Sequence, residues 1–442
     1  MLPRITDKHL SHNKKIEQLL NEFLPPPYYQ VLRGANEIAN ELGYPIYLAG
    51  GSVRDWLMGK TNLDLDLVVE GDGLIFTEYL ATRLRTKYQL HKRYLTATIF
   101  LPGSFKLDIA TTRTEYYPHP AALPRVRKGT LKEDLFRRDF TINTLAIRIN
   151  GPEAPYLVDF FGGEKDLHEG IIKVLHPLSF VDDPTRILRA LRFEQRFDFS
   201  LESDTLDYLR KAVEKAYLAQ VKGARFFQEL FLILSENRPL KVIQRMSDFD
   251  LLRSIHPKIT FSRELQTLLA QVEDSLKWYH SLTRGDKIEE WFIYLLALVN
   301  DLNESDIEEL RKRLALPINH ARKALEDKEQ AERTHQSLRT RSGLRPSQLV
   351  DALSTLSPEA LVFLRAKALD DLIRKQITLY LTTYKEIKPR VTGKDLITLG
   401  IKPGPQFRHI LHKIRELKLD GLLNGKSDEI EYIKEWQNFY HV

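Results

Sequence analysis

The segment IYLAGGSVRDWLMG at residues 46–59 is followed by LDLDLVV at residues 63–69, and these two segments indicate the fold. The first starts as an apolar run, breaks at Gly50 and Gly51, and continues with the spacing of an amphipathic helix. The second has the alternating pattern of a strand. Together they predict a strand, a glycine turn, a helix and a second strand, which begin a mixed α/β unit.

The second strand places two carboxylates close together. Side chains at alternate positions of a strand share a face, so Asp64 and Asp66 are predicted to point to one side. The opposite, core-facing side is predicted to hold Leu63, Leu65 and Leu67. Neighbouring carboxylates repel each other unless a cation lies between them, and hard oxygen ligands suit Mg²⁺. The alternative is a solvated edge strand without a metal.

The glycine pair adds a second feature to the same site. Exposed backbone N–H groups ahead of a helix form a phosphate cradle, and this role is assigned to Gly50 and Gly51. A Mg²⁺ site beside a phosphate cradle indicates nucleotidyl transfer. Arg54 is expected either to contact a triphosphate or to brace Asp55, and bracing is favoured. Asp108 is either a third carboxylate that deprotonates an attacking hydroxyl or an ordinary strand-end aspartate.

The composition is that of a globular protein with several domains. The chain has 442 residues, enough for about two to four domains, and 43% of them are hydrophobic. It contains no cysteine, which excludes disulfides, zinc–thiolate sites and thiol nucleophiles. No apolar run reaches the roughly 18 residues of a membrane helix, and the charged start lacks a secretory signal. We therefore expect a cytoplasmic protein with no membrane partner. The net charge of +6 permits a nucleic-acid partner without requiring one.

The pattern changes from mixed α/β to helical along the chain. Helices are predicted at 28–43 (capped by Gly43), 52–59 and 74–86, and strands at 45–49, 63–69, 93–101, 105–112 and 156–159, with a hairpin turn at Pro102-Gly103. Residues 113–130 hold three prolines and a basic cluster, and they predict an ordered but mobile loop beside the site. A helix carrying KEDLFRRDFTINTLAIRI is predicted to begin near Leu131. Helical spacing dominates after about residue 165.

A second polar group follows on the helix predicted from Leu131. On a helix Asp139 and Asn143 share a face, with Arg138 beside them. The adjacent Arg137 and Arg138 suit triphosphate oxygens through forked hydrogen bonds. Asp139 and Asn143 are then expected to contact ribose hydroxyls or the phosphate-bound metal. The alternative is a solvated polar face.

A third group lies in DDPTRILRALRF at residues 182–193, where Asp-Pro is also a common helix start. Asp183 and Arg186 are three residues apart and can present an acceptor beside a donor. Cytosine and adenine expose an amine next to a bare ring nitrogen, whereas uracil and guanine expose a carbonyl next to an N–H. A fixed Asp/Arg pair is therefore predicted to accept C and A and to reject U and G. Arg189 on the same helix is a further candidate nucleotide contact.

These segments, in this order, resemble the class II tRNA nucleotidyltransferase family, which builds the 3′-terminal CCA of tRNA and shares its head fold with bacterial poly(A) polymerases. The resemblance covers about residues 45–200. GARFFQEL at residues 223–230 resembles the next helical motif, with Arg225 and Glu229 in matching places and Ala224 where an acidic residue is usual. VTGKDLITLGIKPGPQFRHIL at residues 391–411 resembles the segment of the family's tail that holds the tRNA elbow.

The resemblance implies an architecture and residue roles. The expected fold is an α+β head with a polymerase-β-like mixed sheet, followed by an all-α neck, body and tail. The expected domains are a helical lead-in (1–27), the head (28–160), the neck (161–248), the body (249–343) and the tail (344–442). Asp64 and Asp66 are implied to be the metal-binding catalytic pair. The implied recognition residues are Arg137, Arg138 and Asp139 for ribose and triphosphate, and Asp183 and Arg186 for the base.

The implied reaction is a template-independent, Mg²⁺-dependent transfer of CMP, AMP or both from CTP and ATP to the 3′-hydroxyl of tRNA. The loop RTEYYPHPAALPRV (113–126) is most similar to those of A-adding and CCA-adding enzymes, which favours them over CC-adding ones. A complementary CC-adding or A-adding enzyme would then be a partner.

Two other functions remain as alternatives. Bacterial poly(A) polymerases typically carry a basic Gly-Arg-Arg-Phe-type stretch, which LHKRYLTAT at residues 90–98 does not match. A non-catalytic RNA-binding protein on the same scaffold is disfavoured, because it would have no reason to keep both Asp64 and Asp66.

Overall fold

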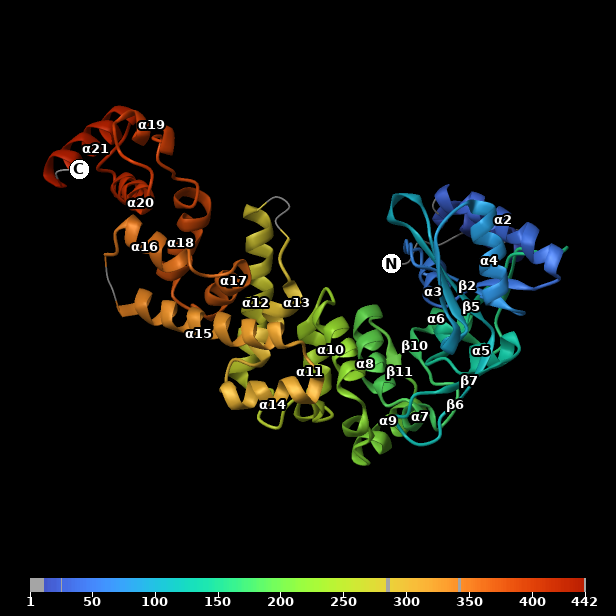
Figure 1. Ribbon diagram of the computed structural model, residues 1–442. Coiled ribbons are helices and arrows are strands. Elements are labelled where there is room, and N and C mark those ends of the chain that lie inside the picture. Colours follow the sequence, from blue (N-terminus) through green and yellow to red (C-terminus); the bar gives the residue numbers. More distant parts are fainter. Residues whose placement is uncertain (1–11, 25, 284–286, 341–342, 441–442) are drawn as a thin grey trace. The chain divides into compact units, whose positions relative to one another are not determined.

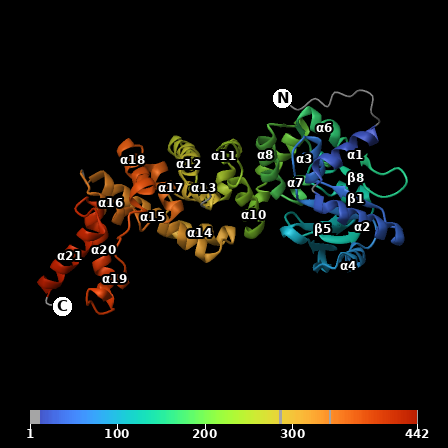
Figure 2. The same ribbon diagram turned by 90° about the horizontal axis from the view of Figure 1, so that it is seen from above.

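The computed structural model describes residues 12–24, 26–283, 287–340 and 343–440. Contacts divide the chain into two compact units, Met1–Glu229 and Leu230–Val442. The first contains a mixed α/β head and a run of helices, and the second is helical (Figures 1 and 2). This confirms the predicted fold class. The finer division into head, neck, body and tail stays a prediction.

The head is built on a seven-stranded sheet with the order β3-β4-β5-β2-β1-β8-β9. Its strands are β1 (Ile46–Ala49), β2 (Leu65–Val69), β3 (Tyr88–His91), β4 (Thr96–Phe100), β5 (Lys106–Thr111), β8 (Ala146–Arg148) and β9 (Tyr156–Val158). β2 and β5 run parallel, and the other neighbours are antiparallel. The sheet is therefore mixed, as expected.

Helices cover the sheet because its central strands are apolar and buried. All four residues of β1 are buried. The helix α4 (Gly73–Leu84) contacts β4 and β5, and α2 (Pro26–Leu42) contacts α4 (Figure 1). α1 (His12–Phe23) contacts β9 and α3 (Gly51–Leu57). The predicted cap of α2 is confirmed, since Gly43 has φ +68°, a left-handed conformation that favours glycine.

The second strand starts later than predicted. β2 begins at Leu65, so Asp64 and Leu63 lie in the segment before it. The prediction that Leu63 faces the core is wrong: it is 49% exposed, whereas Leu65 and Leu67 are at most 1% exposed. The shift follows from the ladder, because the register with β5 starts with Leu65 opposite Leu107.

The helix predicted from Leu131 is much shorter than expected. α5 (Leu131–Phe136) has a capping box from Thr130 and ends before the paired arginines. Phe140 is extended and forms an isolated antiparallel bridge with Val174. A single 3₁₀ turn, η3 (Thr141–Asn143), then leads into β8. Tertiary pairing of Phe140 thus overrides the local helical preference.

The predicted loop at residues 113–130 is partly a two-stranded antiparallel ribbon, β6 (Arg113–Tyr116) with β7 (Arg125–Lys128). The prediction of a loop is wrong for these strands and holds for the residues between them. Similarly, the strand predicted at 93–101 is a 3₁₀ turn, η1 (Lys92–Tyr94), followed by β4, and β3 was not predicted.

The remaining elements are mainly helical. In the first unit they are α6 (Gly163–Glu169), β10 (Ile171–Ile172), α7 (Ser179–Asp182), α8 (Thr185–Phe197), β11 (Ser200–Leu201) and α9 (Ser203–Glu214), and α10 (Gly223–Leu234) runs into the second. The second unit continues with α11 (Pro239–Ser247), α12 (Arg263–Leu282), α13 (Glu290–Leu298), α14 (Glu304–Leu314), α15 (Ile318–Thr340), α16 (Pro346–Leu353), α17 (Pro358–Lys367), α18 (Asp371–Leu379), α19 (Gly393–Thr398), α20 (Pro405–Leu419) and α21 (Lys426–Tyr440). Among the described residues, no helix combines the length and apolar character needed to cross a membrane.

Candidate active site

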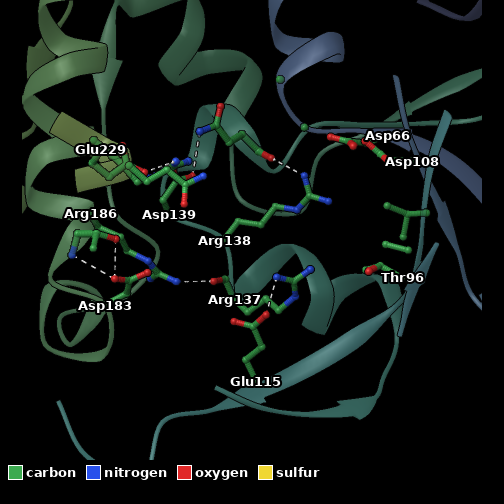
Figure 3. Close-up of a pocket in the computed structure, with 18 of the residues that line it drawn as sticks. Asp66, Thr96, Asp108, Glu115, Arg137, Arg138, Asp139, Asp183, Arg186 and Glu229 are labelled. Carbon is green, nitrogen blue, oxygen red and sulfur yellow. Dashed lines mark hydrogen bonds and ion pairs between the residues drawn. The ribbon is translucent and has the colours of Figure 1, made fainter. Parts of the chain in front are cut away.

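One cavity in the first unit, of about 900 Å³, collects almost all of the predicted site residues. Its lining includes Gly50, Gly51, Arg54, Asp66, Asp108, Arg137, Arg138, Asp139, Asn143, Asp183, Arg186 and Arg189. Asp64 is the predicted site residue that is not part of the lining. Figure 3 shows Asp66 and Asp108 at one side of the cavity, Asp183 and Arg186 at the other, and Arg137, Arg138 and Asp139 between them. The three predicted groups therefore share one space.

The carboxylates at one side come from adjacent strands. Asp66 on β2 lies opposite Asp108 on β5 in the parallel register, so their side chains are on the same face of the sheet. Thr98 Oγ1 donates a 2.6 Å hydrogen bond to Asp108. Asp64, before the strand, is 66% exposed, and the Lys106 ammonium lies between it and Asp108. The pair that the sheet aligns is thus Asp66 with Asp108, rather than Asp66 with Asp64.

The surroundings of Asp66 change the proton affinity of its carboxylate. Partial loss of water around its carboxylate raises its pKa to about 6, and the nearby Asp64 and Asp108 add to this rise, whereas Arg138 opposes it. Solvent still reaches the side chain through the open cavity. A carboxylate with this surrounding negative charge binds a cation readily, because the cation relieves the repulsion.

The glycine turn makes room for an arginine. Gly50 follows β1 with φ +87°, and a Cβ there would lie 2.6 Å from Nη1 of Arg138. The Gly50 N–H donates to the carbonyl of Leu145 at 3.1 Å, so this N–H is already used within the protein. A phosphate cradle at this turn would therefore depend on Gly51 and the residues that follow it, at the start of α3.

Arg54 is held on all sides. Its Nη2 lies 2.7 Å from Oδ1 of Asp55, and its Nη1 donates to Oδ1 of Asn143 at 2.5 Å. The guanidinium stacks over the rings of Phe193 and Phe197, at 5.3 and 4.7 Å from their centroids. The expected bracing ion pair between Arg54 and Asp55 is thus present, and the contacts of Arg54 with the two phenylalanine rings connect α3 to α8.

The two adjacent arginines are oriented by buried carboxylates. Asp134 is fully buried and contacts Nη2 of Arg137 at 2.8 Å and Nη2 of Arg138 at 3.3 Å. Glu115, from β6, contacts Nη1 of Arg137 at 2.9 Å and accepts a hydrogen bond from the Tyr117 hydroxyl. Burial alone would raise the pKa of Asp134, but both arginines hold it below its usual range. These carboxylates thus fix the two guanidinium groups at the cavity wall.

Asp139 and Asn143 meet although the helix predicted to align them is absent. The turn η3 lets the Asn143 amide donate to Oδ1 of Asp139 at 2.9 Å. Oδ2 of Asp139 accepts from Nε and Nη2 of Arg189 at 2.9 and 2.5 Å, and Nη1 of Arg189 lies 3.2 Å from Glu229. Burial would raise the pKa of Asp139, but Arg189 and Asn143 more than compensate and hold it well below its usual range. Asp139 is therefore ionised and joins the head to α8.

At the far side of the cavity, Asp183 and Arg186 each have one hydrogen-bonding group that the other described residues do not use. Oδ1 of Asp183 accepts from the Thr185 hydroxyl at 2.6 Å and pairs with Arg225 at 2.7 Å, and Oδ2 has no hydrogen-bond partner among the described residues. Arg186 donates through Nη1 to Ser179 Oγ and through Nη2 to the carbonyl of Arg137. Its Nε–H bonds to no other described residue. An acceptor and a donor thus remain on two anchored side chains.

Several residues in the cavity lining (Glu115, Tyr117) or beside the site (Arg113, Lys106) were missed from sequence. Glu115 and Tyr117 were placed in an irregular loop, yet with Arg113 they follow a two-residue alternation that a strand would produce. Lys106 also lies two residues before Asp108, on the same face of β5. Period-two spacing of charged residues was the available signal for all four.

The donor set fits a divalent cation. Asp66 and Asp108 offer hard oxygen ligands from adjacent strands, and Asp64 lies across the Lys106 ammonium from Asp108. The Lys106 ammonium already pairs with two of these carboxylates, Asp64 and Asp108.

Comparisons with known proteins identify the family of this chain. The family described as Poly A polymerase head domain matches residues 46–173, and the one described as Probable RNA and SrmB- binding site of polymerase A matches residues 198–262. An A-adding tRNA nucleotidyltransferase from Geobacter sulfurreducens is 40% identical over 94% of this chain, which spans 48% of that protein's length. A structure titled as the Thermotoga maritima CCA-adding enzyme complexed with tRNA is 34% identical, with a TM-score of 0.75 over 95% of this chain and 98% of that one.

A further relative matches end to end. The A-adding tRNA nucleotidyltransferase from Halalkalibacterium halodurans is 33% identical over 97% of both chains. The shared length includes the α/β head, the helices that close the cavity and the helical second unit. This chain therefore belongs to the tRNA nucleotidyltransferase family, and its head domain is of the poly(A) polymerase type.

Proposed function

We propose that this enzyme transfers AMP from ATP to the 3′-hydroxyl of a tRNA that ends in CC, and so completes the CCA end. The observation that carries the proposal is the single cavity in which Asp66 and Asp108 lie opposite Asp183 and Arg186, with Arg137 and Arg138 between them (Figure 3). A nucleoside triphosphate needs this order: a base site, cations for the phosphates, and carboxylates for the metal. The named A-adding relatives favour adenosine as the added nucleotide.

The second candidate is addition of the whole CCA sequence. The similar solved structure is named a CCA-adding enzyme, and it matches nearly the full length of this chain. The pairing of Asp183 and Arg186 does not separate the two, because cytosine and adenine expose the same donor and acceptor order. If only A is added, a separate CC-adding activity has to act on the same tRNA first.

Divalent-metal dependence follows from the family, and we propose Mg²⁺ as the ion, held by Asp64 and Asp66. When bound, the ion would lower the pKa of the attacking hydroxyl and stabilise charge at the α-phosphorus. Asp108 is proposed to accept the proton of the tRNA 3′-hydroxyl. Thr98 and the parallel register fix Asp108 beside Asp66 for this role.

Base selection is assigned to the two groups left available on Asp183 and Arg186. Oδ2 of Asp183 can accept from the exocyclic amine, and Nε–H of Arg186 can donate to the ring nitrogen of C or A. With U or G, the Asp183 acceptor would face a carbonyl and the Arg186 donor would face an N–H. Each polar group left unpaired in this way costs about 1–3 kcal/mol. Arg225 supports the selection by fixing the other oxygen of Asp183.

One experiment tests the function and its subtype. The purified enzyme is incubated with three tRNAs that end before CCA, after C and after CC, with CTP and ATP supplied separately and together, and the ends are sequenced. Addition of a single A to the CC-ending tRNA alone supports the proposal, and growth of all three tRNAs to CCA supports the second candidate. Long A tails on arbitrary RNA would instead indicate a poly(A) polymerase.

Two variants test the residue roles. Asp66→Ala is expected to abolish addition. Asp183→Ala is expected to reduce the preference for A and C over U and G by about tenfold or more, the size of one lost buried hydrogen bond. Unchanged selectivity in both Asp183→Ala and Arg186→Ala would refute the base-selecting role while leaving the transfer reaction intact.

A further inference from the structure

We propose that Lys106 is a built-in competitor for the divalent cation: in the metal-free enzyme its ammonium group holds Asp64 and Asp108, and it has to leave before the ion binds. This inference rests on the proposed function, which assigns the metal to Asp64 and Asp66 and proton acceptance to Asp108. Nζ of Lys106 lies 3.3 Å from Oδ1 of Asp64 and 3.1 Å from Oδ2 of Asp108. The Lys106 ammonium therefore already neutralises part of the negative charge that the divalent cation would neutralise.

The ion pair with Asp64 is supported by a buried tyrosine. Asp64 lies outside the strand ladder, so the ladder does not fix its position. The hydroxyl of Tyr28 lies 3.2 Å from the carbonyl of Leu63 and 2.8 Å from that of Lys106. Tyr28 is 1% exposed, and its ring packs edge-on against Phe105. The backbone on both sides of the Lys106–Asp64 pair is thus held by one rigid group.

The ion pair with Asp108 is fixed by the strand. Lys106 and Asp108 are two residues apart on β5 and point to the same face. Asp108 is also held by Thr98 on β4, through Oδ1, which leaves Oδ2 for the lysine. The ammonium is therefore placed by two independent supports, the Tyr28 hydroxyl and the sheet.

The lysine can leave without disrupting the fold. Its side chain is 54% exposed, so it can turn into solvent without opening a cavity. An ammonium is a single flexible point charge, whereas a divalent cation binds several oxygens at once and displaces it. Displacement still costs the two ion pairs, so the affinity for the cation should be lower than it would be without the lysine.

The test measures metal binding directly, without nucleotide or tRNA. Mn²⁺, which takes the same oxygen ligands as Mg²⁺, is titrated into the full-length enzyme, and the free ion is followed by its paramagnetic resonance signal. In Lys106→Met the dissociation constant is expected to fall by roughly 3- to 10-fold, the size of one or two partly exposed ion pairs. In EDTA, the same variant is expected to unfold at a lower temperature than wild type, and saturating Mn²⁺ should remove this difference.

Lys128→Met is the matched control. Lys128 is 56% exposed and pairs with Asp72 at 2.6 Å, and this ion pair involves none of Asp64, Asp66 and Asp108. It should leave the Mn²⁺ affinity unchanged, and Lys106→Arg should keep the wild-type value. An unchanged or weaker affinity in Lys106→Met overturns the proposal. Asp66→Ala separates the metal assignment from the role of Lys106. If Asp66→Ala removes Mn²⁺ binding while Lys106→Met binds Mn²⁺ with the wild-type affinity, only the role of Lys106 is refuted. If Asp66→Ala leaves Mn²⁺ binding intact, the metal assignment is refuted as well.

Discussion

Buried charged side chains hold the candidate active site together, and Asp139 is one that joins segments far apart in sequence. Two nitrogens of Arg189, the amide of Asn143 and a backbone N–H all donate to its carboxylate. These bonds connect the segment after α5 with α8, two elements that are about fifty residues apart in sequence. Loss of the Asp139 charge should therefore lower the stability of the protein as well as its activity.

We predict that Asp139→Asn lowers the free energy of unfolding by about 2–4 kcal/mol at pH 7, because Arg189 loses its main acceptor while remaining largely buried. The pKa of Asp139 is lower in the folded protein than in the unfolded chain. Its stabilisation is thus complete above about pH 4 and is lost as the pH falls below that value. Urea unfolding of wild type and variant should show a gap that narrows from pH 5 to pH 3.

The control for this prediction is Asp72→Asn, which removes a surface ion pair with Lys128 at a helix N-cap where asparagine is equally suitable. Its effect should stay below about 1 kcal/mol. A gap for Asp139→Asn that is the same at every pH would show that the amide NH₂ facing Arg189, and not the lost titratable charge, destabilises the variant.

Tyr28 gives a second prediction for a single residue. Tyr28→Phe leaves the carbonyls of Leu63 and Lys106 without this donor, which should lower stability by about 1–2 kcal/mol. Because the Asp64 segment also loosens, kcat for nucleotide addition should fall by about tenfold. Tyr29→Phe is the matched control, since the exposed Tyr29 hydroxyl donates, within the described part of the chain, to the carbonyls of Leu20 and Asn21 alone. Equal kcat values for the two variants would contradict the role of Tyr28.

At the scale of elements, the turn between β1 and α3 determines where Arg138 can lie. We predict that Gly50→Ala destabilises the protein by about 2–3 kcal/mol, partly because φ +87° with ψ −133° is strained for any other residue. The added Cβ would also lie 2.6 Å from Nη1 of Arg138. The displaced arginine should raise KM for ATP at least severalfold, as measured by steady-state addition to a CC-ending tRNA.

Gly43→Ala separates these two causes. Gly43 also has a positive φ, +68°, but nothing lies within 4 Å of a Cβ built there. This variant should lose about 1 kcal/mol and keep the wild-type KM for ATP. If both variants change KM equally, the effect comes from general destabilisation and not from Arg138.

The elements that the sequence predicted are the ones whose signals are local. The strand, glycine turn and helix at residues 46–59 are encoded by neighbouring residues, and the structure has them within two residues of the predicted bounds. The β6–β7 ribbon was missed because it depends on pairing Arg113 with Lys128 across a proline-containing connection. The helix from Leu131 was overextended because only the bridge of Phe140 to Val174 ends it.

The site follows the same division. Residue types and their spacing are enough to place Asp66, Arg138 and Asp183 in one functional set. They do not show that Asp108 is the strand partner of Asp66, or that Lys106 lies between Asp64 and Asp108. Strand order and register bring those groups together, and neither is contained in the spacing of the residues along the chain.

For the whole molecule, the small size of the cavity compared with a tRNA makes a prediction about salt. The catalytic cavity is lined by residues of the first unit only, and its arginines have fixed, mostly buried partners. A tRNA is much larger than this cavity, so most of its phosphates have to be met elsewhere on a chain of net charge +6. Contacts at an exposed surface are screened by salt far more strongly than buried ones.

We therefore predict that raising KCl from about 50 to about 200 mM increases KM for tRNA by at least about tenfold, because bound phosphates release counterions. KM for ATP, measured at saturating tRNA for each salt concentration, should change by less than about threefold, since buried carboxylates hold the cavity arginines in place. Free Mg²⁺ is held constant so that metal binding does not vary. Parallel increases in both KM values would mean that the triphosphate site is as accessible to salt as the tRNA-binding surface. A KM for tRNA that does not change with salt would mean that shape, and not phosphate charge, dominates tRNA recognition.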